Sequence, residues 1–255
     1  MVDLQTVVHV LLIAVIGGVV GLDRTAVGQF MISQPIVAGP LTGWLLGDVN
    51  AGFVIGAVLE LIWVMDMPIG NFVPADSTVA AVSATAIAAL AGQGSAPLST
   101  VGFSIFLTVF MAPLTMLADG ILRKRNERLA ELAATGEAEK ADRNLERAHR
   151  AGLVAFFLKS FVLYLLFVPA GLAGMHLFFR MPGQFHNAMA LFVKLLPLLG
   201  AASVARKLSI RTADRFLLAG FFIATVSALA FGVSMLVITL MVISAGWVGV
   251  RYSDR

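Results

Sequence analysis

The sequence predicts an all-α membrane protein with about seven to nine transmembrane or re-entrant helices and a charged cytoplasmic helical loop. The first observation is composition: 59% of the 255 residues are hydrophobic and 13% are charged, whereas soluble domains are about half apolar and roughly a quarter charged. The second is that long apolar stretches recur, several near the ~20 residues that cross a bilayer core. Lipid would solvate the outward-facing apolar side chains, which a soluble fold could not cover.

The N-terminal part contains one long apolar stretch and two short ones. Leu4 to Leu22 is expected to be a retained span rather than a cleaved signal peptide, because Asp3 stands where a positive charge is usual. The stretches Pro35 to Leu46 and Ala51 to Met65 are short for full spans. Turn residues from Gly47 to Asn50 separate them. We interpret the pair as a helical hairpin that enters the membrane and returns to the same side.

The middle of the chain alternates polar and apolar segments. A polar interruption, Asp66 to Ser77, precedes a helix of small residues, Thr78 to Ala91, which is expected to be central because small residues let helices pack closely. Ser99 to Leu122 is a further span. Residues 123–150 hold eight Lys or Arg and six Asp or Glu. Their basic flanks predict a cytoplasmic helical hairpin, broken at Thr135-Gly136. It is either a solvated linker or a docking surface for a soluble protein.

The C-terminal part is again apolar. Ala151 to Phe179 and Ala188 to Val204 are predicted spans, and Phe216 to Val250 has about 35 residues, enough for two tight spans. The chain therefore divides into an N-terminal membrane part with the hairpin and a candidate site (1–122), the charged loop (123–150) and a C-terminal membrane part (151–255).

Several functional classes are excluded by residue usage. There is no cysteine, so disulfides, thiolate metal sites and cysteine nucleophiles are absent. No two histidines have the i, i+4 spacing of a metal site, so no metal is expected, and no GxGxxG or Walker sequence is present, so no cofactor is expected either. His9, on an apolar helix, is interpreted as a structural residue. The basic residues gather at the ends of apolar stretches rather than on a separate face, which argues against nucleic-acid binding despite a net charge of +3.

Polar groups inside apolar segments are the candidate functional residues. Glu60 lies well inside an apolar run, where an ionisable group is costly and is a functional candidate by default. It is either a carboxyl paired with backbone or arginine, or a solute or proton site, and we favour the second. Gln29 and Gln34 precede the second apolar stretch and either line a path or lie just outside the span.

The interruption from Asp66 to Ser77 contains two prolines, a glycine, two acids and an amide. Irregular backbone at membrane depth is tolerated only where it is buried in protein or lines a wet cavity, and carboxylates and amides suit sugar hydroxyls. The alternatives are an ordinary exposed loop and, for Asp76-Ser77, a cap on the next helix. The substrate-binding candidates are Glu60, Asp66, Asn71, Asp76, Gln29 and Gln34, with no catalytic or metal-binding residue.

A set of short motifs resembles a known family. The motifs are Gln34-Pro35, Leu46-Gly47-Asp48, Gly52, Gly56, Leu59-Glu60-Leu61, Ile69-Gly70 and Asp76. As a set they resemble the membrane IIC subunit of the mannose/fructose/sorbose class of the bacterial sugar phosphotransferase system. The resemblance is strong from Gln29 to Leu90 and extends more loosely to the whole chain. The chain departs from the family pattern at Pro68, where family members usually carry Asn, and the identity of the sugar stays open.

The resemblance implies a mechanism shared among several proteins. A separate IID membrane subunit would form the sugar path with this chain, commonly as a trimer of heterodimers in the bacterial inner membrane. Soluble IIA and IIB proteins would relay phosphate from phosphoenolpyruvate through histidines, and IIB would phosphorylate the sugar, so this chain would not be an enzyme. The sugar-contact region would be the stretch from Glu60 to Asp76.

Two other functional hypotheses remain at this stage. One is a stand-alone secondary transporter in which Glu60 and Asp66 bind protons or sodium ions, with pKa values shifted by burial. The other is a membrane receptor or assembly factor, in which case neutralising Glu60 and Asp76 would leave function intact. We favour the transport subunit over both.

Overall fold

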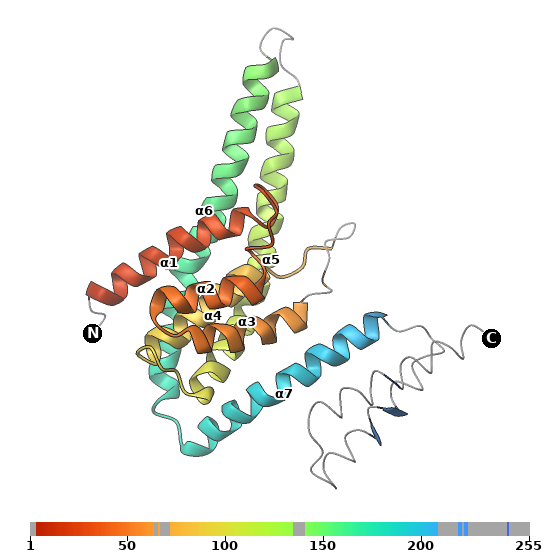
Figure 1. Cartoon of the computed structure of the whole chain (residues 1–255). Helices are drawn as coiled ribbons and strands as arrows, with labels where there is room; N and C mark the ends of the chain where they lie inside the picture. The colour runs from red at the N-terminus through yellow and green to blue at the C-terminus, as the bar shows by residue number, and fades with distance from the viewer. Residues whose placement is uncertain are drawn as a thin grey trace, which may run out of the picture. The chain divides into compact units, whose positions relative to one another are not determined.

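The computed structural model describes residues 4–63, 66, 72–134, 141–208, 219–220, 222–223 and 244. Over these residues the chain is helical and contains no strand, which confirms the predicted all-α fold. The candidate Asn71 and all but five residues of Phe216 to Val250, where two spans are predicted, lie outside the described residues. The helices are α1 (Leu4–Leu22), α2 (Pro35–Leu46), α3 (Val49–Trp63), α4 (Ser77–Ala91), α5 (Leu98–Ala134), α6 (Ala141–Phe178) and α7 (Gly183–Leu208) (Figure 1).

The chain divides into two compact units, Met1–Ala201 and Ala202–Arg255, and the description below concerns the first. Within the part of the chain that the structure describes, four helical stretches are long and apolar enough to cross a membrane: Leu4–Leu22, Leu98–Ala134, Asp142–Phe178 and Gly183–Ser203. Helices α2, α3 and α4 have 12, 15 and 15 residues. At ~1.5 Å per residue they are about 18 to 22 Å long, shorter than the ~30 Å hydrocarbon core.

Helices α2 and α3 form the predicted hairpin. Gly47 ends α2 with a φ of 81°, the left-handed conformation that glycine adopts at little cost. The carboxylate of Asp48 then accepts a hydrogen bond from the Ala51 N–H at 3.0 Å. The two backbones touch at Gly39 and Gly52, since a Cβ on Gly39 would lie 2.6 Å from the Gly52 carbonyl oxygen. The hairpin is confirmed as a unit, and its re-entry into a membrane stays a prediction.

Helix α4 is the central element, as its small residues predicted. Twelve of its 15 residues are buried, and it contacts α1, α2, α3, α5 and α6. One face belongs to a hydrophobic cluster with Tyr164 and Phe167 of α6. The other face belongs to a second cluster with Ile55 and Leu59 of α3. Helix α4 therefore joins the hairpin to the long helices.

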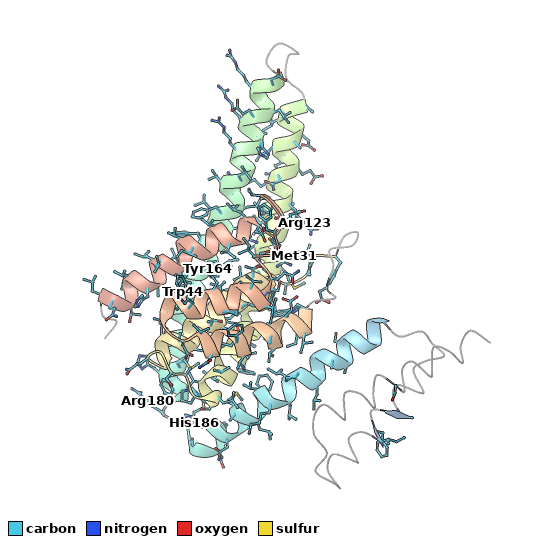
Figure 2. The ribbon with its side chains drawn as sticks, viewed as in Figure 1. Met31, Trp44, Arg123, Tyr164, Arg180 and His186 are labelled. Atoms are coloured by element: carbon cyan, nitrogen blue, oxygen red, sulfur yellow. The ribbon has the colours of Figure 1, made fainter. Side chains whose placement is uncertain are left out.

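Helix α1 crosses α6 at a stripe of glycines. A Cβ on Gly17 would lie 2.5 Å from the ring of Tyr164, and one on Gly21 would lie 2.8 Å from Ser160 Oγ. Figure 2 shows Tyr164 in this crossing region. The small residues therefore allow the close approach that packing between helices in lipid requires.

Helices α5 and α6 continue past the other helices as a charged pair (Figure 1). Residues 123–134 extend α5 and residues 141–150 begin α6, so both helices run unbroken across the boundaries that we predicted at residues 122 and 150. The predicted break at Thr135-Gly136 lies outside the described residues. We call residues 123–134 and 141–150 the charged extension.

Candidate functional site

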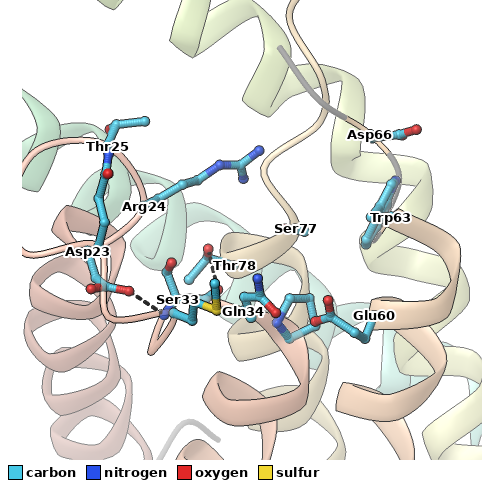
Figure 3. Close-up of a pocket in the computed structure, with 13 residues that line it drawn as sticks. Asp23, Arg24, Thr25, Ser33, Gln34, Glu60, Trp63, Asp66, Ser77 and Thr78 are labelled. Atoms are coloured by element: carbon cyan, nitrogen blue, oxygen red, sulfur yellow. Dashed lines mark hydrogen bonds between the residues drawn. The ribbon is translucent and has the colours of Figure 1, made fainter.

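A cavity of about 430 Å³ lies where the loop after α1, the start of α2, the end of α3 and the start of α4 meet (Figure 3). It contains four of the six predicted site residues: Gln29, Gln34, Glu60 and Asp66. Asp76 is not among the lining residues, and Asn71 is outside the described part of the chain. The lining residues are Asp23, Arg24, Thr25, Gln29, Met31, Ser33, Gln34, Pro35, Glu60, Trp63, Asp66, Ser77 and Thr78.

Asp23 shapes the loop that forms one wall of the cavity. Its carboxylate accepts hydrogen bonds from the Phe30 N–H at 2.6 Å and the Ser33 N–H at 3.0 Å. Burial alone would raise the pKa of Asp23, but these backbone hydrogen bonds outweigh it and lower the pKa. The loop backbone needs such support because Gln29 and Met31 have φ values of 54° and 66°. Sequence reasoning did not identify Asp23.

Glu60 has a structural partner and also lines the cavity. Its Oε2 accepts a hydrogen bond from the Ile36 N–H at 3.2 Å. That N–H belongs to the first turn of α2, where backbone donors have no partner within the helix and a negative charge is favoured. Pairing with the backbone and a role in a solute site, the two alternatives for Glu60, therefore do not exclude each other. Gln34, the residue before α2, makes no side-chain capping bond.

Trp63 adds an aromatic wall that sequence reasoning missed. It is the last residue of α3 and lies one helical turn after Glu60, which puts both side chains on one face of the helix. Figure 3 shows Glu60, Trp63 and Asp66 on one side of the cavity and Asp23 and Arg24 on the other. The sequence did carry a signal for Trp63, because it stands at position i+3 from the acid Glu60.

Asp76 lies behind the cavity and is 2% exposed. Its Oδ1 accepts a hydrogen bond from the Val79 N–H at 3.2 Å, so Asp76 caps α4. A cap on this helix was one of the alternatives that the sequence offered for Asp76. The same oxygen accepts from Arg24 Nη1 at 2.9 Å, and Oδ2 accepts from Lys159 Nζ at 2.7 Å. The Asp76 N–H donates to Thr115 Oγ1 at 2.9 Å. Both carboxylate oxygens are engaged, so Asp76 acts on the cavity through Arg24.

Arg24, Asp76, Lys159 and Asp119 form one charge network. Lys159 Nζ also donates to Asp119 Oδ1 at 2.8 Å, so two cations and two anions alternate between the end of α1 and helices α4, α6 and α5. The lysine side chain is 10% exposed and that of Asp119 is 18% exposed. The sequence carried a signal here, because Lys159 interrupts a long apolar run just as Glu60 does.

Within the described residues, no group of three or more His, Asp or Glu side chains is arranged to hold a metal ion. The side chains that line the cavity offer hydrogen bonding and charge. Carboxylates accept hydrogen bonds, amides both donate and accept, and an indole ring presents an apolar face. The set fits a small polar ligand with an apolar side.

Comparison with known proteins gives the family. The model of the sorbose-specific IIC component of the PTS system matches residues 7–247. The chain belongs to this family. The resemblance predicted from the motifs at Glu60 and around it is thereby confirmed, and the match extends over the charged extension and the C-terminal part.

Individual relatives align over shorter segments. The chain is 32% identical over 80 residues to the putative N-acetylgalactosamine permease IIC component 2 of Escherichia coli K12, covering 31% of this chain and 59% of that protein. It is 29% identical over 118 residues to the mannose-specific EIIC component of the same strain, covering 46% and 42%. It is 32% identical over 138 residues to the sorbose-specific EIIC component of Lacticaseibacillus casei, covering 53% and 46%. The alignments thus span about half the length of these curated relatives.

A solved structure described as that of a membrane protein superposes with a TM-score of 0.64. It is 21% identical and is matched over 97% of its own chain and 100% of this one. At this identity the likeness shows the fold. It agrees with the all-α fold described above.

Proposed function

We propose that this chain is the IIC transport subunit of a phosphoenolpyruvate-dependent sugar phosphotransferase system, and that it binds the sugar in the cavity beside Glu60. Membership in the IIC family supports this proposal, because the matched relatives are named as sugar-specific components or permeases. A IID membrane subunit completes the translocation path, and a soluble IIB protein phosphorylates the sugar.

The observation that carries the proposal is the convergence of sugar-binding chemistry from three separate segments. Gln29 and Gln34 come from the loop after α1, Glu60 and Trp63 from α3, and Asp66 from the segment that follows. In the proposed complex the carboxylates accept hydrogen bonds from sugar hydroxyls and the amides donate and accept. The indole packs on the apolar face of the sugar ring.

Other residues hold this arrangement in place. The backbones of α2 and α3 touch at their glycines, and Glu60 accepts a hydrogen bond from the first turn of α2. Asp76 and Lys159 hold Arg24 at the cavity wall. Asn71 belongs to the same proposal as a further amide, contributed by the segment between Asp66 and Asp76.

The phosphoryl transfer belongs to the partners in this proposal. IIA and IIB relay the phosphate through their histidines, and no residue of this chain carries it, so the chain is a transport subunit and not an enzyme. The charged extension is the place where we expect the soluble partner to dock, on the cytoplasmic side of the bacterial inner membrane. The assembled form would be a trimer of heterodimers with IID.

The test is uptake and phosphorylation of a panel of sugars in cells that lack their own phosphotransferase components and co-express this chain with its IID, IIA and IIB partners. At least one sugar should accumulate as its phosphate, and omission of any partner should stop accumulation. Gln34→Ala should reduce uptake, whereas Gln184→Ala, which removes an exposed amide outside the cavity, should not. Uptake by this chain alone in liposomes, driven by a proton gradient, would favour the stand-alone transporter instead.

A further inference from the structure

We propose that a second cavity, between α1 and α6, holds one acyl chain of a membrane phospholipid, with the phosphate group at the polar end of the cavity. This cavity has a volume of about 620 Å³ and lies between the first half of α1, the end of α4 and the second half of α6. The cavity beside Glu60 is lined from Asp23 onward, after the other end of α1. The inference therefore concerns a separate site and does not depend on the proposed function.

The lining of the second cavity on α6 forms one continuous stripe. Leu165, Pro169, Leu172, His176 and Phe179 follow one another at intervals of three or four positions, so they share one face of the helix. At ~1.5 Å per residue the stripe is about 21 Å long. Spread over this length, the volume corresponds to a mean cross-section of about 30 Å². The cavity is therefore long and narrow.

The polar side chains of the lining gather at one end of the stripe. Among the 14 lining residues that the structure describes, Thr6, Gln93 and His176 are polar and the others are apolar. Thr6 is the third residue of α1, Gln93 follows the end of α4, and His176 is in the last turn of α6. Leu165, at the other end of the stripe, lies about three turns deeper along α6. This distribution suits a ligand with a polar head and a hydrocarbon tail.

The surroundings of the cavity favour a lipid over a polar solute. Helix α1 and the stretch Asp142–Phe178 of α6 are both long and apolar enough to span a membrane. Val7, Leu11 and Phe179 of the lining are 42%, 46% and 48% exposed, and in a bilayer such apolar surface is solvated by acyl chains. The ends of spans lie at the level of the lipid head groups, and the polar end of the cavity is formed by such ends.

A helix of a partner membrane protein is the main alternative occupant, and the size of the cavity argues against it. A helix with its side chains is about 10 Å wide, so ~21 Å of helix occupies roughly 1,600 Å³. This is more than twice the volume of the cavity. A single hydrocarbon chain is much narrower and can lie along the stripe.

Arg180 provides a partner for the phosphate group. It comes four positions after His176, directly beyond the end of α6, and it is exposed. Figure 2 shows Arg180 near this end of α6. A guanidinium binds phosphate oxygens through two parallel N–H groups, and the amide of Gln93 offers a further donor. The positive guanidinium therefore complements the negative phosphodiester of a phospholipid whose chain lies along α6.

The experiment maps the contacts of a photoreactive phospholipid on the full chain in nanodiscs, together with any membrane partner that co-purifies. The nanodiscs are made of phosphatidylcholine with a minor fraction of phosphatidylglycerol that carries a diazirine near the end of one acyl chain. Mass spectrometry locates the adducts after irradiation. We expect adducts at Leu165 and Leu172 to exceed those at Leu158 and Leu166, exposed residues of α6 outside the cavity, by at least about fivefold.

Two exposed alanines of α6 provide a matched pair of variants. Ala173 lines the cavity, whereas Ala170, three positions earlier, does not. Ala173→Trp fills part of the cavity and should lower the adducts at Leu165 and Leu172 by about fivefold. Ala170→Trp should leave them unchanged. Circular dichroism and size-exclusion profiles confirm that both variants are folded.

A second pair of variants tests the polar end. Labelled phosphatidylglycerol should give more adducts at Leu165 than labelled phosphatidylcholine present at the same fraction, because the anionic lipid gains more from the guanidinium. Arg180→Gln should bring the two yields together. Arg143→Gln, on the exposed surface of the charged extension, is the control and should keep the preference.

Four results would overturn the inference. Adducts spread evenly over the exposed apolar residues of α1 and α6 would mean that lipid only surrounds the protein. Cavity adducts that appear only after the membrane partner is removed would identify a protein occupant instead. Equal effects of the two tryptophan variants would separate the adducts from the cavity. A lipid preference that Arg180→Gln leaves unchanged would refute the position of the phosphate.

Discussion

Lys159 of α6 and Asp76 at the start of α4 form an ion pair of 2.7 Å across 83 positions of sequence. The lysine also reaches Asp119 of α5 at 2.8 Å. Because Asp76 in turn holds Arg24, a lysine in the middle of a long apolar helix is connected to the wall of the cavity. The shape of the candidate site therefore depends on residues that do not touch its ligand.

Removal of this lysine should destabilise the protein. Lys159→Met removes the cation that Asp119 contacts and leaves Asp76 with Arg24, and breaking a buried pair in this way typically costs about 3 to 5 kcal/mol. We expect a clear fall in the thermal unfolding midpoint in detergent. Lys194→Met, which changes an exposed lysine of α7, is the control. Addition of Asp119→Leu to the lysine variant should restore part of the loss, and a single variant as stable as the original chain would refute the network.

The carboxylate of Asp23 gives a pH-dependent prediction. Its pKa is lowered in the folded protein, so its hydrogen bonds to the loop contribute stability at neutral pH. That contribution is full above the ordinary carboxyl pKa of about 4 and is lost as the pH falls through the lowered value. The stability difference between the original chain and Asp23→Asn should be constant from neutral pH to about 5 and shrink below 4. A difference independent of pH over this range would contradict the assignment.

The glycines of the α2–α3 hairpin should not tolerate a side chain. A Cβ on Gly52 would lie 2.5 Å from the carbonyl oxygen of Gly39, so Gly52→Ala must separate two backbones. Gly120 of α5 has nothing within 4 Å of its Cβ position, and Gly120→Ala should stabilise the helix by about 0.5 to 1 kcal/mol. Gly52→Ala should lower the thermal unfolding midpoint, and Gly120→Ala should raise it. Shifts of the same sign would argue against close backbone packing.

Trp63 should contribute to sugar affinity through its ring. Trp63→Ala removes the aromatic wall and should weaken binding by about tenfold, in line with the ~1 to 3 kcal/mol that burial of a large side chain is worth. Trp63→Phe should retain most of the affinity. Trp44, which is 67% exposed on α2 (Figure 2), provides the control, and Trp44→Ala should bind sugar normally. Equal losses from the two alanine variants would remove Trp63 from the site.

The helices near the N-terminus could be predicted closely from the sequence. The bounds Leu4–Leu22 and Pro35–Leu46 agree with the structure, because each apolar run is delimited by a charge, a proline or a glycine turn. The central position of α4 could be predicted from its small residues, because small residues let neighbouring helices approach closely. These are local signals, and no knowledge of distant contacts was needed to use them.

The rest of the site depends on contacts between distant segments. Glu60, Gln29 and Gln34 were recognised as polar groups near apolar runs, but their meeting with Asp23 and Arg24 is produced by the loop after α1 and by the tertiary contacts of α4. The role of Asp76 as a cap and ion-pair partner required knowledge of Lys159. An isolated charge in an apolar run predicts that a partner exists, and it does not say which residue that partner is.

The central claim is that the cavity beside Glu60 is the sugar path, and cysteine labelling tests it most directly. The chain has no cysteine, so a single thiol can be placed by Thr25→Cys at the cavity and by Ser95→Cys on an exposed loop outside it. In membranes that contain the transport complex, a transported sugar should slow maleimide labelling at position 25 and leave labelling at position 95 unchanged. Labelling at position 25 that no transported sugar affects would contradict the account.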